Sequence, residues 1–111
     1  MDKVATYRKY VQQLIEQYAT DGTSGDDIER ETIIDTTHDH YQILNVGWRG
    51  EHRIYGCVMH FDIKNGKIWI QQNGTELDVA EELMQLGVSQ NDIVLGFQSP
   101  YKRPYTGFAT Q

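Results

Sequence analysis

The chain has 111 residues, enough for one domain with a single modest core but too few for a second. Its formal net charge of -6 excludes the basic excess typical of an autonomous nucleic-acid-binding domain, so any DNA contact would be local or made through a partner protein. The single cysteine, Cys57, excludes an internal disulfide and suits a reducing compartment. No stretch approaches the roughly 20 apolar residues of a membrane span, and no apolar signal region opens the chain, so we expect a cytoplasmic protein without membrane contact.

The N-terminal segment predicts an amphipathic helix. Its apolar side chains recur at steps of three and four residues and share one stripe: Val4, Tyr7, Val11, Leu14, Ile15 and Tyr18. Asp2 is suited to cap the start of this helix, and Gly22 is suited to follow its end. Residues 20–27 are small, polar and rich in glycine and aspartate, which predicts a mobile loop.

Four β-strands are expected next: Arg30–Thr36, Tyr41–Trp48, His52–Ile63 and Lys67–Asn73. Gly50-Glu51 predicts a type II′ turn, because glycine supplies the positive φ that the first central position needs. Asn65-Gly66 predicts a type I′ turn, which needs positive φ at both central residues. These two turns predict the pairing of the last three strands.

The predicted pairing sorts the side chains of the sheet onto two faces. One face is expected to form the core: Ile33, Leu44, Val46, Tyr55, Cys57, Met59, Phe61, Ile63, Ile68 and Ile70. The opposite face is mixed: Asn45, Ile54, Val58, His60, Asp62, Trp69 and Gln71. A thiol on the core face is expected to be inert packing.

A second helix follows the sheet. Thr75 and Asp78 form a capping-box pattern, and an apolar stripe runs from there to Gly87. Ser89 and Asp92 repeat the box and predict a short turn, and the proline-containing tail is expected to pack as an irregular arm. The predicted fold is a single α+β domain over residues 1–111, a four-stranded antiparallel meander with an N-terminal helix and a second helix after the sheet.

The turn His38-Asp39-His40 carries residue types that bind zinc. A usable site needs three or four convergent ligands, and neither His52 nor His60 is obviously convergent with this turn. We therefore favour a polar turn in which Asp39 binds nearby backbone N–H groups, and we expect neither a metal nor a cofactor.

His60, Asp62, Trp69 and Gln71 share the mixed face and are the candidate partner-binding residues, because tryptophan is favoured at protein–protein contacts. Cover of this face by the C-terminal arm remains the open alternative. A His60–Asp62 pair is also suited to general acid–base work, which keeps a metal-dependent nuclease or hydrolase as an alternative function. No nucleophile, phosphate-binding loop or metal motif accompanies the pair.

Two small basic groups are the candidate nucleic-acid contacts: Arg49, His52 and Arg53 at a hairpin tip, and Lys102 and Arg103 in the arm. Charged hairpin tips are more often solvated turns, and we favour that reading for the first group. Tyr101 and Tyr105 flank the second group, and aromatic residues interleaved with basic ones are found in nucleic-acid-binding proteins.

Many short runs of the chain match one known family in order. They are Asp39-His40-Tyr41-Gln42, Asn45-Val46-Gly47-Trp48, Arg53-Ile54-Tyr55-Gly56-Cys57, His60-Phe61-Asp62-Ile63, Lys67-Ile68-Trp69-Ile70-Gln71-Gln72, Gly74-Thr75-Glu76, Leu86-Gly87-Val88, Asp92-Ile93-Val94-Leu95-Gly96-Phe97 and Ser99-Pro100. With these runs the chain resembles, over nearly its whole length, the XisI family. These proteins are controlling factors for excision of the fdxN element in heterocyst-forming cyanobacteria.

The resemblance implies a non-enzymatic accessory role in site-specific DNA excision. It implies an XisH-like, nuclease-related protein as partner and a recombinase acting alongside, and it brings no catalytic residues to carry over. Direct DNA binding through Arg49 and Arg53 remains the weaker alternative, and a homo-oligomer is left open.

Overall fold

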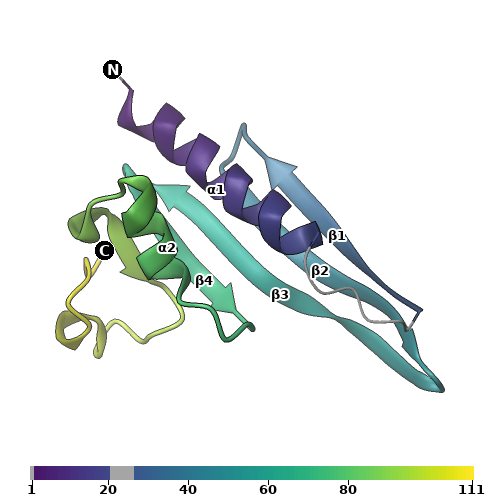
Figure 1. Cartoon of the computed structure of the whole chain (residues 1–111). Coiled ribbons are helices and arrows are strands. Elements are labelled where there is room, and N and C mark those ends of the chain that lie inside the picture. The colour runs from purple at the N-terminus through teal and green to yellow at the C-terminus, as the bar shows by residue number, and fades with distance from the viewer. Residues whose placement is uncertain (1, 21–26) are drawn as a thin grey trace.

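The computed structural model describes residues 2–20 and 27–111 of the chain. Two helices lie over one face of a curved sheet, and the C-terminal arm lies at one end of it (Figure 1). Within the described ranges, no helix combines the length and apolar character needed to cross a bilayer. The predicted loop at residues 20–27, apart from its two end residues, and the predicted helix end at Gly22 lie outside the described residues.

Helix α1 (Lys3–Thr20) confirms the N-terminal prediction. Five members of its apolar stripe are buried in the core, namely Tyr7, Val11, Leu14, Ile15 and Tyr18. Asp2 caps its start, since Oδ1 of this residue accepts a hydrogen bond of 3.0 Å from the backbone N–H of Val4. The helix owes its position to this buried stripe, because most helical stability in proteins comes from packing of an apolar face.

In the described part of the chain the sheet has five strands in the order β1-β2-β3-β4-β5: β1 (Asp27–Asp35), β2 (His40–Arg49), β3 (His52–Lys64), β4 (Lys67–Asn73) and β5 (Ile93–Leu95). The first four form the predicted antiparallel meander, but the predicted number of strands is wrong. Strand β5 pairs in parallel with β4, and helix α2 (Val79–Leu86) supplies the crossover that a parallel neighbour requires. A strand of three residues is too short to show a periodic pattern in the sequence.

Both predicted turns are confirmed. Gly50 has φ +60° and Glu51 does not have positive φ, as a type II′ turn requires. Asn65 and Gly66 have φ +54° and +76°, as a type I′ turn requires. The predicted cross-strand pairs Val46–Tyr55, Leu44–Cys57, Phe61–Ile70 and Ile63–Ile68 are all present.

A β-bulge at Val58 nevertheless overturns half of the predicted core face. Ile43 pairs with Met59, but the next residue, Leu44, pairs with Cys57, so Val58 is the extra residue in β3. Because side chains alternate along a strand, the residues beyond the bulge change face relative to the prediction. Five predicted core residues therefore lie on the face away from the helices: Ile33, Leu44, Val46, Tyr55 and Cys57. Three residues predicted on the mixed face turn to the helix side instead: Asn45, Ile54 and Val58.

Helix α2 begins one turn later than its predicted cap. Asp78, not Thr75, is the N-cap, and its side chain accepts a hydrogen bond from the backbone N–H of Glu81. Thr75 instead donates a hydrogen bond of 2.6 Å to Asn73 in the preceding turn. The helix ends at Gly87 with φ +119°, as predicted.

Two short 3-10 helices, η1 (Gln90–Asp92) and η2 (Arg103–Tyr105), flank β5 and the start of the arm. Ser89 caps η1 as the repeated box predicts, with its hydroxyl accepting from the backbone N–H of Asn91. The arm returns to the sheet at Ala109, which forms an isolated bridge with Val94 of β5.

Candidate functional site

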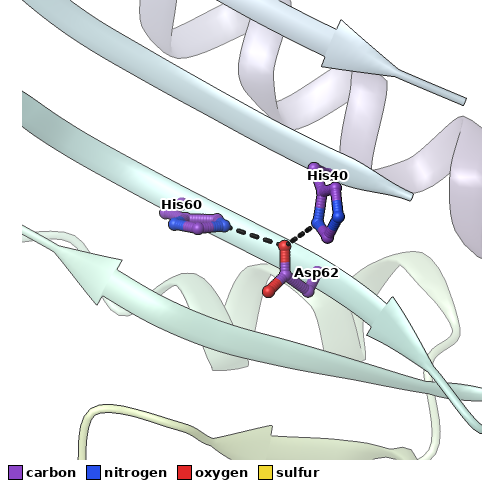
Figure 2. Close-up of side chains that lie close together, drawn as sticks. All are labelled: His40, His60 and Asp62. Atoms are coloured by element: carbon purple, nitrogen blue, oxygen red, sulfur yellow. Dashed lines mark hydrogen bonds and ion pairs between the residues drawn. The ribbon is translucent and has the colours of Figure 1, made fainter. Parts of the chain in front are cut away.

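Three side chains that are able to bind a metal ion or move a proton converge on the outer face, the face of the sheet away from both helices (Figure 2). His40 and Asp62 form a cross-strand pair between β2 and β3, and His60 lies two residues before Asp62, so all three share this face. Nδ1 of His40 and Nε2 of His60 each lie 2.8 Å from Oδ1 of Asp62. We call these three residues the His–Asp–His cluster.

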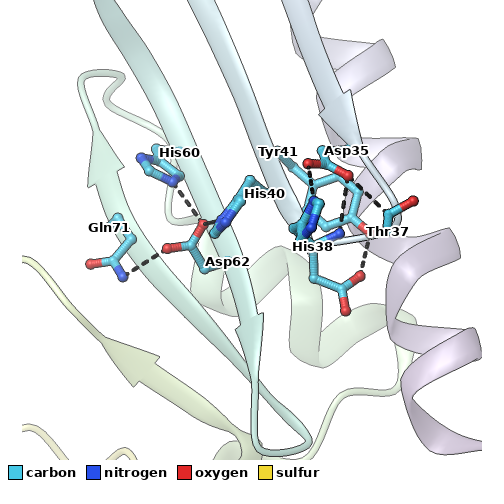
Figure 3. Close-up of polar contacts among 9 residues, drawn as sticks. Asp35, Thr37, His38, His40, Tyr41, His60, Asp62 and Gln71 are labelled. Atoms are coloured by element: carbon cyan, nitrogen blue, oxygen red, sulfur yellow. Dashed lines mark hydrogen bonds and ion pairs between the residues drawn. The ribbon is translucent and has the colours of Figure 1, made fainter.

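The carboxylate at the centre of this cluster is buried and fully engaged. Asp62 is only 8% exposed, and Gln71 donates a hydrogen bond of 3.1 Å to its other oxygen, Oδ2 (Figure 3). Burial opposes the charge, but the hydrogen bonds from His40, His60 and Gln71 outweigh it and hold the pKa of the Asp62 carboxyl below its ordinary value. The hydrogen bond to Asp62 raises the pKa of His40. The cluster thus keeps a buried carboxylate ionised between two imidazoles.

The sequence places His60, Asp62, Trp69 and Gln71 on one face, and this placement is confirmed. Their role in binding a partner stays a prediction. The expectation that His60 does not converge with the 38–40 turn is wrong for His40. Strand β2 begins at His40, one residue earlier than predicted, and cross-strand pairing then brings this imidazole to Asp62. The predicted pairing, extended to His40, would have placed it opposite Phe61, so only the bulge at Val58 brings it opposite Asp62.

The other two residues of the turn have structural partners of their own. His38 lies 2.9 Å from Asp35, which also accepts hydrogen bonds from backbone N–H groups of the turn (Figure 3). Asp39 accepts from Arg8 at 2.7 and 3.1 Å and from Tyr41 at 2.8 Å. The polar turn is therefore present, but Asp35 has the role that was predicted for Asp39.

The C-terminal arm partly covers Trp69. The ring of Trp69 is half-buried, with Nζ of Lys64 4.1 Å and the guanidinium carbon of Arg103 5.1 Å from its centroid. Arg103 is held in place by a hydrogen bond of 3.0 Å from its Nε to the backbone oxygen of Gln98. Two cations on one ring are a favourable arrangement for the electron-rich face of indole. Trp69 is thus less available to a partner than the sequence suggests.

The two basic groups do not form one surface. The β2–β3 tip that carries Arg49, His52 and Arg53 and the arm that carries Lys102 and Arg103 lie at opposite ends of the molecule (Figure 1). Arg53 packs over two aromatic rings, with its guanidinium carbon 5.4 Å from the centroid of Trp48 and 5.9 Å from that of Tyr55. Contact of these two basic groups with nucleic acid stays a prediction.

The bulge creates a surface that the sequence prediction missed. Beyond the bulge the outer face carries apolar side chains that we call the outer apolar patch: Ile33, Leu44, Val46, Trp48 and Tyr55. Tyr55 is 68% exposed and Trp48 is 49% exposed. Three exposed carboxylates of β1 lie beside this patch because they pair with its β2 residues: Asp27, Glu29 and Glu31. An exposed apolar group next to a row of charges is typical of a protein-binding surface.

Comparisons with known proteins agree with this architecture. The profile of the XisI family, described as XisI protein, matches residues 1–110. The crystal structure of an XisI-like protein from Anabaena variabilis is 53% identical, with a TM-score of 0.91 over 97% of this chain and 98% of that one. A second structure from the same organism, the fdxN element excision controlling factor XisI, is 37% identical, with a TM-score of 0.87 over 99% of this chain and 100% of that one. A comparison with curated proteins finds no match. The chain therefore belongs to the XisI family.

Proposed function

We propose that this chain is a non-enzymatic controlling factor for site-specific excision of an fdxN-type DNA element. The observation that carries this proposal is its similarity to a protein named as such a factor, which extends over almost the full length of both chains. The net charge of -6 supports a role exerted through protein partners rather than by direct binding of DNA. We propose an XisH-like protein as the direct partner, with the recombinase acting alongside, in the cytoplasm.

We propose the outer face of the sheet as the docking surface for the XisH-like protein. The outer apolar patch offers exposed aromatic side chains, Tyr55 and Trp48, of the kind that carry most of the binding energy at interfaces. The carboxylates of β1 beside the patch favour a partner that presents basic groups around an apolar centre. The candidate partner-binding residues predicted from the sequence, His60, Asp62, Trp69 and Gln71, continue this face toward the arm.

Co-purification and isothermal titration calorimetry with the XisH-like protein test this proposal. Tyr55→Lys places a cation in the outer apolar patch and is expected to weaken binding at least about tenfold. Tyr105→Lys is the matched control, because Tyr105 is 86% exposed in the arm and lies outside the patch. Absence of a complex at micromolar concentration would refute the partner. Equal binding by both variants would refute the proposed surface. A dimer detected by light scattering would identify a second copy of this chain as the occupant of the surface.

A second candidate, a metal-dependent nuclease or hydrolase, is favoured by one observation, the convergence of the His–Asp–His cluster. His60 and Asp62 would then hold the ion that activates a water molecule. A nuclease assay with Mg²⁺, Mn²⁺ or Zn²⁺, run on the wild type and on His60→Ala, tests this function. Activity that survives in His60→Ala, or inactive wild-type protein, would remove it.

A further inference from the structure

Two imidazoles and a carboxylate from neighbouring strands meet at one point of the outer face. We infer that His40, His60 and Asp62 form a binding site for one divalent transition-metal ion, for which Zn²⁺ is the best fit. Their ligand atoms all lie within 4.8 Å of one another. This inference does not depend on the proposed function, since an ion here is compatible with a controlling factor as well as with an enzyme.

The distances between the ligand atoms suit a zinc ion. Zinc bonds to nitrogen and oxygen are about 2.0–2.1 Å long, so adjacent ligands of a tetrahedral ion lie about 3.3 Å apart. Both imidazole nitrogens lie 2.8 Å from Oδ1 of Asp62. Each of them would move away from Oδ1 by about half an ångström. The two nitrogens, which lie within 4.8 Å of each other, would have to come to a similar separation by rotation of the imidazole side chains.

The backbone and the neighbouring side chains hold the site in place. His40 and Asp62 are directly paired and His60 is two residues away, so the separation of the ligands is set by the sheet itself. Gln71 binds Oδ2 of Asp62 and so orients Oδ1 toward the two imidazoles. Hydrogen bonds of this kind to ligating carboxylates are typical of metal sites and tune their affinity.

The exposure of the three side chains provides an entry path for the ion. The side chain of Asp62 is 11% exposed, that of His60 25% and that of His40 51%, so the site opens toward solvent on the His40 side. Three protein ligands with one open side leave a coordination position for water. In this respect the site resembles catalytic rather than closed structural zinc sites.

The donor set determines which ions compete for the site. Imidazole nitrogen suits Zn²⁺, Co²⁺ and Fe²⁺, and two histidines with one carboxylate and open positions are a known arrangement for non-haem iron. Mg²⁺ and Ca²⁺ prefer oxygen ligands throughout and are expected not to bind. The competing explanation is that the three residues make only a hydrogen-bonded network.

Calorimetric titration of the chelator-treated full chain with ZnCl₂ tests the inference, together with the absorption of the Co²⁺-loaded protein. We expect one ion per chain at micromolar concentration, visible d–d bands with Co²⁺, and a higher melting temperature with Zn²⁺. MgCl₂ is expected to change none of these. Wild-type protein that binds neither Zn²⁺ nor Co²⁺ at about 100 µM would overturn the inference, because a site of this kind should be filled at that concentration.

Matched variants locate the site. His40→Gln, at the exposed side of the cluster, is expected to fold and to lose most of the affinity, and Gln71→Ala is expected to weaken binding about tenfold. His52→Gln is the control, because His52 is an exposed histidine of the hairpin tip outside the cluster. Equal affinity of His40→Gln and wild type would overturn the inference, as would loss of binding in His52→Gln alone.

Discussion

Tyr7 of α1 donates a hydrogen bond of 2.6 Å to Oδ2 of Asp92, which lies 85 residues further along the chain. Lys3 reaches the same oxygen at 3.2 Å. Burial and the contact with Asp92 raise the pKa of Tyr7 to about 12. Burial acts to raise the pKa of Asp92, but the hydrogen bonds from Tyr7 and Lys3 outweigh it and lower that pKa. The contact ties the first helix to the turn that leads into β5.

We therefore predict that Tyr7→Phe lowers the free energy of unfolding at pH 7 by about 1.5–3 kcal/mol, as for other hydrogen bonds to charged groups.

Because the folded-state pKa of Asp92 is depressed, its contribution to the free energy of unfolding is present above the ordinary carboxyl pKa of about 3.9 and is lost as the pH falls through the lower folded value. Urea titrations of wild type and Asp92→Asn should differ clearly at pH 7 and converge at strongly acidic pH. Glu76→Gln, an exposed carboxylate, is the control. If wild type and Asp92→Asn differed in unfolding free energy by the same amount at both pH values, this prediction would be contradicted.

Substitution of Gly47 is predicted to destabilise the fold, because the backbone of the neighbouring strand β1 lies close to this residue. A Cβ atom there would collide with the backbone oxygen of Asp27, and the residue has φ +156°. Gly47→Ala should therefore destabilise the fold by on the order of 1–3 kcal/mol in thermal or urea unfolding. Gly56→Ala on the facing strand is the control, since a Cβ atom there meets nothing within 4 Å. Equal stability of the two variants would show that β1 is able to move aside.

Acrylamide quenching should separate the two tryptophans of the chain. In Trp48→Phe the remaining tryptophan is Trp69, which Lys64 and Arg103 protect. Its quenching is expected to be weaker than that of the 49% exposed Trp48 in Trp69→Phe. Arg103→Ala in the Trp48→Phe background should increase the quenching of Trp69, because it removes the cover that the arm provides. Lys102→Ala, an exposed neighbour, is the control. Strong quenching of Trp69 without any change at Arg103 would show that the arm does not cover it.

Cys57 is predicted to react slowly with iodoacetamide at neutral pH. Burial raises the pKa of its thiol, and its Sγ donates a hydrogen bond of 3.3 Å to the backbone oxygen of Met59. Since the thiolate is the nucleophile, the alkylation rate followed by mass spectrometry should be below that of glutathione and should rise steeply above pH 8.5, the ordinary thiol pKa. The chain unfolded in urea is the reference. A folded rate equal to the unfolded rate would contradict this prediction.

Patterns that span only a few residues were predictable. The α1 stripe, the Asp2 cap, both hairpin turns and the end of α2 at Gly87 depend on contacts within one or two turns of chain, and all of them are confirmed. The family resemblance is confirmed as well. Three of the four residues of the candidate site were also predictable, because His60, Asp62 and Gln71 follow from the alternation of two strands joined by one tight turn.

The remaining features depend on pairings between distant segments. The bulge at Val58 moves Leu44 and Tyr55 out of the core, and the alternation of apolar residues is the same with or without it. The same is true of His40, whose place opposite Asp62 depends on the register that this bulge sets, and of β5, which pairs only after α2 has crossed the sheet. The sequence by itself determined the helices, the turns and the family. Only the tertiary structure decided which face is exposed and which ligands meet, because a single inserted residue reverses a face without changing any local preference.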